Sequence, residues 1–205
     1  MFEVRLAVPS DTPALEALIR RSGVGLSVGF YTPEQAQAIT QHVFGVDSQL
    51  VEDGTYFVVE HYGSPVACGG WSKRRTLFGG DRAKSGPDPL LDPAVEAARI
   101  RAFFVEPSMA RRGLGRLLMD RCIAEALRAG FRSMELVATL PGEPLYLASG
   151  FAVLERFELS LPPDIRVPVT RMSRPLSPAD ACEGPAAAGS AAKGDSSATA
   201  ERDRL

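Results

Sequence analysis

Residues that bind metal ions or form disulfide bridges are scarce in this sequence. Its 205 residues include three cysteines and two histidines, and no two cysteines have the CxxC spacing. An odd number of cysteines without that spacing is not a disulfide framework, so we expect reduced thiols. His42 and His61 lie far apart in the sequence, and we therefore expect no metal site.

Long apolar segments and a strong net charge are also missing. No apolar run approaches the roughly 20 residues that a membrane-spanning helix needs. Residues 1–5 lack the basic-then-apolar order of a secretory signal. The formal net charge is −2, which gives no bulk attraction to nucleic acid or to an anionic membrane. We therefore expect a cytoplasmic protein whose partners are neither nucleic acid nor membrane.

Residues 100–129 hold the most informative pattern in the chain. Residues 100–105 are rich in β-branched and aromatic side chains, which predicts a buried strand. After a turn, apolar side chains recur at intervals of three and four residues, which predicts an amphipathic helix. That helix begins near Gly113 or Gly115, and Gly130 is placed to form its C-terminal cap.

The turn between this strand and this helix is suited to binding an anion. It reads Arg-Arg-Gly-Leu-Gly-Arg from residue 111 to residue 116. A helix N-terminus presents unpaired N–H groups, glycines allow close approach to them, and arginines add charge. Leu118 replaces the third glycine of a dinucleotide fingerprint, and the Gly-Lys-Ser/Thr end of a Walker loop is missing. The turn predicts a pyrophosphate cradle, and an ordinary glycine turn with a solvated helix start is the alternative.

Two segments resemble motifs of the GNAT superfamily of N-acetyltransferases. Residues 105–115 resemble the family's acyl-CoA motif, Gln/Arg-x-x-Gly-x-Gly/Ala, with Ala110 at the position of glutamine or arginine. Residues 145–151, Leu-Tyr-Leu-Ala-Ser-Gly-Phe, are similar to the family's Phe-Tyr-x-x-x-Gly-Phe, with leucine in place of the first aromatic residue. The two motifs follow the family's order, and the resemblance covers roughly residues 3–175.

The resemblance implies a fold, a co-substrate and a set of site residues. The fold would be an α/β fold whose mixed sheet is flanked by helices and whose splayed parallel strands hold acyl-CoA. Acetyl-CoA would be the co-substrate, without a metal ion. Tyr146 would be the general acid for the departing thiolate, and a backbone N–H near Val105 would bind the thioester carbonyl. The residues implied in cofactor binding are Phe103, Phe104, Val105, Arg111, Arg112, Gly113, Leu114, Gly115 and Arg116.

The remaining sequence predicts the other elements of a domain that spans residues 1–176. A helical connection between the strands at 100–105 and 134–139 implies a right-handed parallel crossover. Gly69 and Gly70 inside a strand suggest a β-bulge or a close approach to the backbone. Further strands are expected at residues 2–8, 55–61, 66–73, 151–160 and 167–173, and further helices at 12–23, 33–44 and 144–149.

Two segments depart from this regular pattern. Residues 73–94 form a polar, basic insertion that is too long for a tight hairpin. A solvated loop is one interpretation, and a rim of the acceptor site or a dimer contact is the other. Residues 177–205 consist mostly of alanine, serine, glycine and proline, which predicts a disordered low-complexity tail.

The sequence leaves the acceptor and the catalytic base open. Glu60, Glu96 and Glu106 lie near expected strand ends, but each is more commonly a solvated carboxylate, so we name no base. By the resemblance, Phe30 and Tyr31 are candidates for one wall of the acceptor site, although packing is the commoner role of such aromatics.

The main hypothesis is an acetyl-CoA-dependent N-acetyltransferase that moves the acetyl group directly to a primary amine. The amine would be carried by a small molecule or a peptide, and the resemblance permits a homodimer. One alternative is a catalytically inactive acyl-CoA-binding sensor or partner module. A nucleotide-binding domain that uses the same glycine turn is another.

Overall fold

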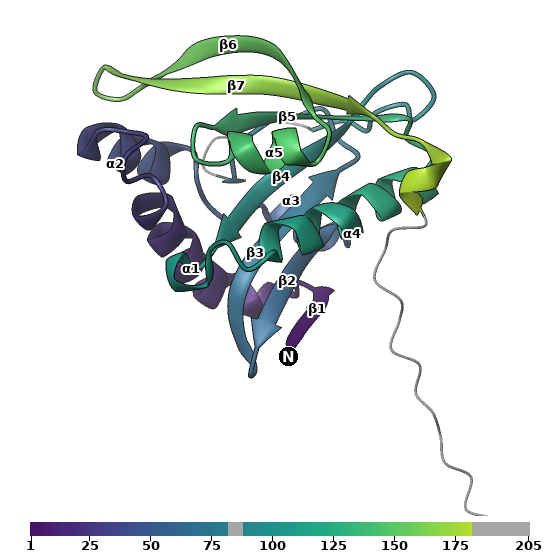
Figure 1. Ribbon diagram of the computed structural model, residues 1–205, viewed down its shortest axis with the longest axis horizontal. Coiled ribbons are helices and arrows are strands. Elements are labelled where there is room, and N and C mark those ends of the chain that lie inside the picture. The colour runs from purple at the N-terminus through teal and green to yellow at the C-terminus, as the bar shows by residue number, and fades with distance from the viewer. Residues whose placement is uncertain (82–87, 182–205) are drawn as a thin grey trace, which may run out of the picture.

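The structure is a computed structural model that describes residues 1–81 and 88–181. Within these ranges the chain forms a seven-stranded sheet with helices on both faces (Figure 1). The sheet order is β1-β2-β3-β4-β5-β7-β6, and β4 and β5 form its parallel pair. The predicted α/β fold with a mixed sheet is therefore confirmed. The strands are β1 (Phe2–Leu6), β2 (Tyr56–His61), β3 (Ser64–Ser72), β4 (Ala98–Val105), β5 (Ser133–Thr139), β6 (Ala152–Leu161) and β7 (Ile165–Pro175).

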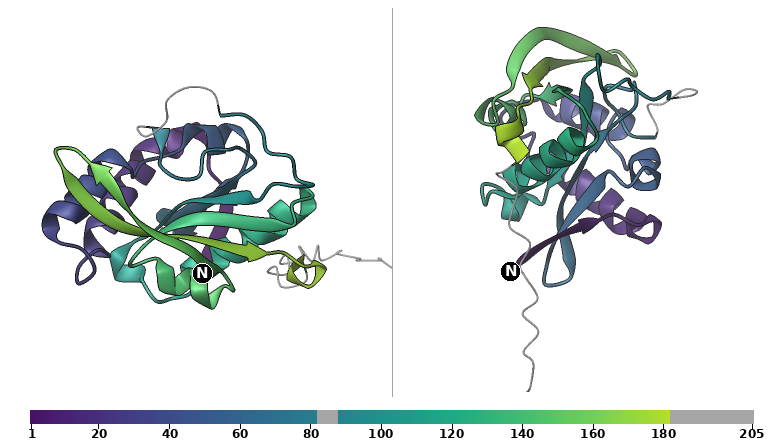
Figure 2. Two further views of the ribbon diagram at one scale, coloured as in Figure 1. Left: turned by 90° about the horizontal axis from the view of Figure 1, so that it is seen from above. Right: turned by 90° about the vertical axis from the view of Figure 1, so that its right-hand side faces the viewer.

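Alternation along the strands gives the sheet two apolar faces. Phe57 and Val59 pack beneath α4, whereas Tyr56 and Val58 pack beneath α1 and α3. Figure 2 shows the sheet between these two helical layers. No helix in the described ranges is long and apolar enough to cross a membrane. The helices are α1 (Thr12–Gly25), α2 (Pro33–His42), α3 (Ser48–Glu52), α4 (Leu114–Arg128) and α5 (Glu143–Ala148), with 3-10 turns η1 (Pro9–Asp11), η3 (Pro107–Met109) and η4 (Pro178–Ala181).

The start of α2, near the beginning predicted at residue 33, is fixed by its own side chains. The Thr32 hydroxyl accepts the N–H of Gln35, and the Gln35 amide oxygen accepts the N–H of Thr32. This reciprocal pair is a capping box, and Pro33 occupies the first helical position. The Gln35 amide group also donates to the carbonyl of Arg166 at 2.7 Å, which ties α2 to β7.

Helix α1 continues beyond the glycine that was expected to end it. Gly23 lies inside the helix, and a Cβ atom there would lie 2.7 Å from the Thr40 hydroxyl and 2.8 Å from the Phe44 ring. This glycine therefore allows α1 and the end of α2 to pack closely, which is a contact that a local sequence pattern does not reveal.

The parallel strands β4 and β5 pair at one end and then separate. Their ladder consists of Ala98 opposite Met134 and Arg99 opposite Glu135. Beyond these pairs β5 remains bonded to β7 as far as Thr139, while β4 stays with β3. Arg99 and Arg171 both donate to the Glu135 carboxylate, which joins three strands where the separation begins. The predicted splay of the parallel strands is confirmed.

A β-bulge lies beside the glycine pair of β3, but its extra residue is in the partner strand β4 and not in the glycine-containing strand. The pairing register shifts between Cys68 and Gly70, and Ala102 adopts a left-handed φ of 54°. A Cβ atom on Gly69 would lie 2.6 Å from the ring of Phe103, so glycine is required for this approach. The bulge places Phe103 on the α4 side of the sheet.

The described part of the 73–94 insertion is bonded to the body of the domain. Arg74 forms two hydrogen bonds with Asp53, at 2.7 and 2.8 Å, and Gly80 donates its N–H to the carbonyl of Val43. Arg74 also pairs with Leu90 in an isolated β-bridge. These contacts rule out a freely solvated loop over residues 73–81 and 88–94.

Regular structure extends past the predicted domain end at residue 176. The 3-10 turn η4 follows, and its Asp180 accepts hydrogen bonds from Arg174 and from the N–H of Ser177. These polar contacts lie within the segment whose composition predicted disorder, and the domain boundary at residue 176 stays a prediction. The remaining tail, residues 182–205, lies outside the described residues.

Candidate active site

A cavity of about 740 Å³ lies where β4 and β5 separate. One part, here called the turn end, is lined by residues 110, 111 and 113–116 and by α5. The other part, here called the apolar end, is lined by α1, α2, residues 78–80 and the β6–β7 hairpin. That hairpin extends toward α2 (Figure 1). The side chains at the apolar end include Leu26, Phe30, Ile39, Val43, Phe44, Phe78, Val137, Leu159 and Val169.

The backbone of the turn end has the shape that suits an anion. Gly113 is the N-cap of α4 with a φ of 82°, and Arg111 has a φ of 63°. Left-handed residues at a helix start direct successive N–H groups to one side and create an anion-binding concavity. A Cβ atom on Gly113 would meet nothing within 4 Å, so the glycine serves the backbone conformation rather than packing.

Most of the predicted cofactor residues line the cavity, and three have additional roles. Leu114, the first residue of α4, is buried in the core. Arg116 donates a hydrogen bond from its Nε to Asp120 at 2.8 Å. Gly115 lets α5 pack against α4, because a Cβ atom there would lie 2.8 Å from Leu145. Arg112 does not line the cavity. The predicted residues that do are Phe103, Phe104, Val105, Arg111, Gly113, Leu114, Gly115 and Arg116.

The backbone N–H of Val105 already has a partner, which the sequence did not predict. It donates to the hydroxyl of Ser22 at 3.1 Å, so the group expected to bind a thioester carbonyl is occupied in this structure. Ser22 is buried and lines the cavity. It follows Leu15, Leu18 and Ile19 at helical spacing. A polar residue in this apolar stripe was the signal that could have identified it.

Tyr146 is buried on α5 and lines the cavity. Its ring lies edge-on to the rings of Phe103 and Phe151, at centroid distances of 6.3 and 6.0 Å. Burial raises the pKa of the Tyr146 phenol well above its usual value, with a smaller contribution from Cys122. The hydroxyl group therefore stays protonated at neutral pH and acts as a hydrogen-bond donor.

The three carboxylates considered from the sequence lie outside the cavity and have partners elsewhere. Glu60 accepts from Arg5, and Glu106 accepts from Arg21 at 2.8 Å. Glu96 accepts the N–H of Asp92 at 2.8 Å. Within residues 1–81 and 88–181, no aspartate or glutamate lines this cavity. Its titratable lining residues in those ranges are Arg101, Arg111, Arg116 and Tyr146.

A buried ion pair, also missed from the sequence, builds part of the apolar end. Arg101 and Asp47 lie 2.8 Å apart, and their side chains are 1% and 0% exposed. Arg101 also donates to the carbonyls of Thr76 and Gly79. Burial lowers the pKa of the Arg101 guanidinium, and Asp47 opposes this shift. A charged residue in a buried strand was a signal that such a partner must exist.

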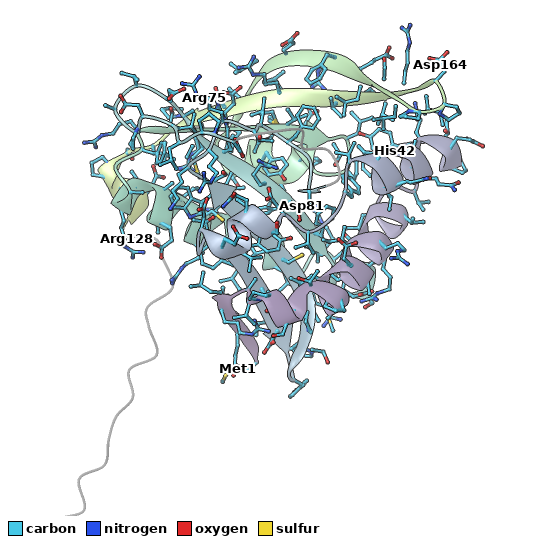
Figure 3. All side chains as sticks on the ribbon, turned by 180° about the vertical axis from the view of Figure 1, so that it is seen from behind. Met1, His42, Arg75, Asp81, Arg128 and Asp164 are labelled. Atoms are coloured by element: carbon cyan, nitrogen blue, oxygen red, sulfur yellow. The ribbon has the colours of Figure 1, made fainter. Side chains whose placement is uncertain are left out.

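These bonds bring the insertion over the sheet and into the cavity wall. Phe78, Gly79 and Gly80 line the cavity. Asp81, labelled in Figure 3, accepts the N–H of Ser48 at the start of α3. The insertion was expected to be either a solvated loop or a rim of the acceptor site or dimer contact. Residues 78–80 form part of the cavity wall, which is closer to a rim than to a solvated loop.

The two aromatic residues considered for the acceptor wall have different positions. Phe30 lines the cavity and is 49% exposed. The Tyr31 hydroxyl donates to the carbonyl of Pro168 and accepts the N–H of Leu140, at 2.7 and 2.9 Å. Tyr31 therefore holds the end of β5 to β7 and does not line the cavity.

Solved structures of N-acetyltransferases share this fold. A GCN5-related N-acetyltransferase from Rhodopseudomonas palustris aligns with a TM-score of 0.63 at 18% identity, over 85% of this chain and 95% of that one. One from Kribbella flavida aligns with a TM-score of 0.55 at 22% identity, over 85% and 98%. The PaiA N-acetyltransferase from Thermoplasma acidophilum, in complex with coenzyme A, aligns with a TM-score of 0.58 at 11% identity, over 85% and 99%.

At these low sequence identities, structural similarity defines only the fold, whereas a match to a family model also defines the family. Residues 26–151 match the model of the acetyltransferase (GNAT) family. The matched segment covers more than half of the chain and contains the turn, α4 and Tyr146. The chain therefore belongs to the GNAT acetyltransferase family. No curated protein matches its sequence.

Proposed function

We propose that this protein is an N-acetyltransferase that moves the acetyl group of acetyl-CoA directly to a primary amine. Its membership of the GNAT family supports acetyl transfer in general. The observation that carries the proposal is one cavity that joins the left-handed turn at α4, the gap between β4 and β5, and the hydroxyl-bearing ring of Tyr146. Direct transfer requires this continuity, because the thioester and the amine must meet at one point.

The turn end fits the phosphate groups of coenzyme A in shape and charge. The concavity at Gly113 is open, and Arg111 and Arg116 line the same part of the cavity. Phosphate oxygens accept hydrogen bonds from N–H groups at a helix start and pair with arginine. A related fold, the PaiA N-acetyltransferase, was solved in complex with coenzyme A. The diphosphate would lie at this turn, with the acyl arm along Phe103 to Val105.

Tyr146 is proposed to assist the departure of the thiolate. In the overall step the amine nitrogen bonds to the acetyl carbon, the carbon–sulfur bond breaks, and one proton passes from the amine to the thiol. Because burial raises its pKa, Tyr146 is a better hydrogen-bond donor than proton donor toward a thiolate. Ser22 accepts the Val105 N–H and keeps its own proton to donate toward the acetyl carbonyl.

Thermal unfolding with acetyl-CoA, CoA, ATP and NAD side by side tests the cofactor. A ligand at about 100 times its dissociation constant stabilises the folded state by about 2.7 kcal/mol. We expect a shift with acetyl-CoA and CoA, and none with ATP or NAD. A shift with ATP or NAD alone would favour the nucleotide-binding alternative, and no shift with either CoA species would contradict the proposal.

The substitution Tyr146→Phe separates an enzyme from a catalytically inactive acyl-CoA sensor. We expect kcat to fall by roughly 10- to 100-fold, because a hydrogen bond to a charged group contributes about 1.5–3 kcal/mol, while the affinity for CoA stays unchanged. The matched control is Tyr62→Phe, because Tyr62 is 87% exposed. If the protein binds acetyl-CoA but acetylates no amine, the sensor alternative holds. The cytoplasmic location and the homodimer stay predictions.

A further inference from the structure

The apolar end of the cavity offers an acceptor almost no charge. Its walls are aliphatic and aromatic side chains from five segments, among them Leu26, Phe44, Phe78, Leu159 and Val169. Three of these, Phe44, Phe78 and Leu159, also pack against the core cluster that joins α2 to β7. The surface that an acceptor would touch is therefore continuous with the hydrophobic core of the domain.

Two polar side chains in this part of the cavity, Arg101 and Ser27, are bonded within the protein. Arg101 donates to two backbone carbonyls and pairs with Asp47. The Ser27 hydroxyl donates to the carbonyl of Gly23. The guanidinium charge is thus offset by Asp47, so this ion pair attracts an anion only weakly and offers little attraction to a second cation.

A carboxylate that could pair with an ammonium group is absent from the described lining. Glu143 lies between the lining residues Gly142 and Pro144, but both of its oxygens accept hydrogen bonds from Arg156. One of them also accepts from Thr170 at 2.7 Å. Arg156 holds the pKa of Glu143 below its usual value. Glu143 is therefore committed to the β6–β7 hairpin.

The composition of the walls decides between classes of amine. A polyamine or an aminoglycoside carries several ammonium groups, and burying an unpaired charge in an apolar site costs several kcal/mol. A monoamine with an apolar body places its hydrocarbon against these walls and carries one titratable nitrogen. Burial lowers the pKa of an amine, so the site itself favours the neutral, nucleophilic form. This accounts for a cavity that has no carboxylate base in its described lining.

We infer that the acceptor is a small primary monoamine carried on an aromatic or aliphatic body. This inference rests on the proposed N-acetyltransferase function and names the acceptor class of the same site. A cavity of about 740 Å³ lies within the range of small-molecule sites, which extends to about 1,000 Å³, and it must also hold the acyl arm.

Rates of thiol release from acetyl-CoA test the inference with a matched set of amines. The set is 2-phenylethylamine, 1,4-diaminobutane, spermidine, kanamycin and a short peptide with a free N-terminal alanine. We expect kcat/KM for 2-phenylethylamine to exceed that for each of the others by at least 10-fold. A preference for a polycation or for the peptide would overturn the inference while the proposed function stands.

A charge placed at the apolar end sharpens the test. Phe30 is half-exposed at the cavity, so its replacement should not disturb folding. Phe30→Glu should move the ratio of kcat/KM for 1,4-diaminobutane over 2-phenylethylamine at least 10-fold toward the diamine. Phe30→Gln, whose new side chain is uncharged, is the matched control and should not move this ratio 10-fold. An equal change in both variants would overturn the inference.

Failure of the inference and failure of the proposed function give different results. If acetyl-CoA stabilises the protein and a polyamine is the preferred acceptor, the acceptor class is wrong and the enzyme class is right. If no CoA species stabilises the protein and no amine is acetylated, both are overturned.

Discussion

The two ends of the cavity are built in different ways. The turn end depends on backbone conformation: left-handed residues at Arg111 and Gly113 and the start of α4 form it within one short segment. The apolar end depends on side chains that α1, α2, residues 78–80 and the β6–β7 hairpin bring together. A single substitution can therefore disrupt the turn end. The apolar end depends instead on contacts that hold separate segments in place.

One of these long-range contacts is the buried ion pair of Arg101 and Asp47. It connects β4 to the residue just before α3, and Arg101 continues to the carbonyls of Thr76 and Gly79. Breaking it should therefore affect the apolar end and leave the turn end intact. The loss of folding stability on breaking this pair is the largest effect that we expect to distinguish the two ends.

We expect Asp47→Asn to destabilise the fold by about 3–5 kcal/mol, because it leaves the guanidinium of Arg101 buried without a counter-charge. Urea denaturation at neutral pH measures this loss. The control is Glu158→Gln, which removes an exposed pair with Arg166 at 3.5 Å and should cost about 0–1 kcal/mol. If the two variants are equally stable, the buried pair does not hold this end of the cavity together.

At the turn end, Gly113→Val should weaken CoA binding at least 10-fold. The new side chain would enter the open concavity, and a left-handed backbone is strained for any residue with a Cβ atom. Gly54→Val is the matched control, because Gly54 also has a positive φ and open space but does not line the cavity. Calorimetric titration with CoA measures both variants.

Both variants should lose a similar amount of stability, about 1–2 kcal/mol from left-handed strain. Loss of CoA affinity should be confined to the variant at Gly113. If Gly54→Val weakens binding equally, the effect is general strain and the turn is not the anion site.

The sequence predicted the turn end well because its determinants are local. The strand before Pro107, the glycine at the helix start and the helical period of α4 all lie within one stretch of chain. The short helix that carries Tyr146 was predicted for the same reason, since α5 and Gly150 form one short motif. Turn chemistry and periodicity report on neighbours in sequence, and these neighbours are also neighbours in space.

The apolar end could not be predicted in the same way. Its key contacts join residues far apart in the chain, such as Ser22 with Val105 and Asp47 with Arg101. Helix α3, with five residues, is too short to show a period. Polar residues at buried positions of α1 and β4 were the available signals. They indicate that a partner exists without saying which residue it is.

The smallest expected effect is a change in melting temperature on truncation at the end of the domain. It also compares a local signal, composition, with a contact that composition does not report. Composition places the end at residue 176, whereas Arg174 bonds to Asp180 beyond it. A chain that ends after Ala181 should therefore melt like the full chain. A chain that ends after Leu176 loses this partly buried pair, about 1 kcal/mol, and should melt roughly 2–4 °C lower by calorimetry. Equal melting of the two truncated chains would mean that η4 adds no stability and that composition alone had placed the end correctly.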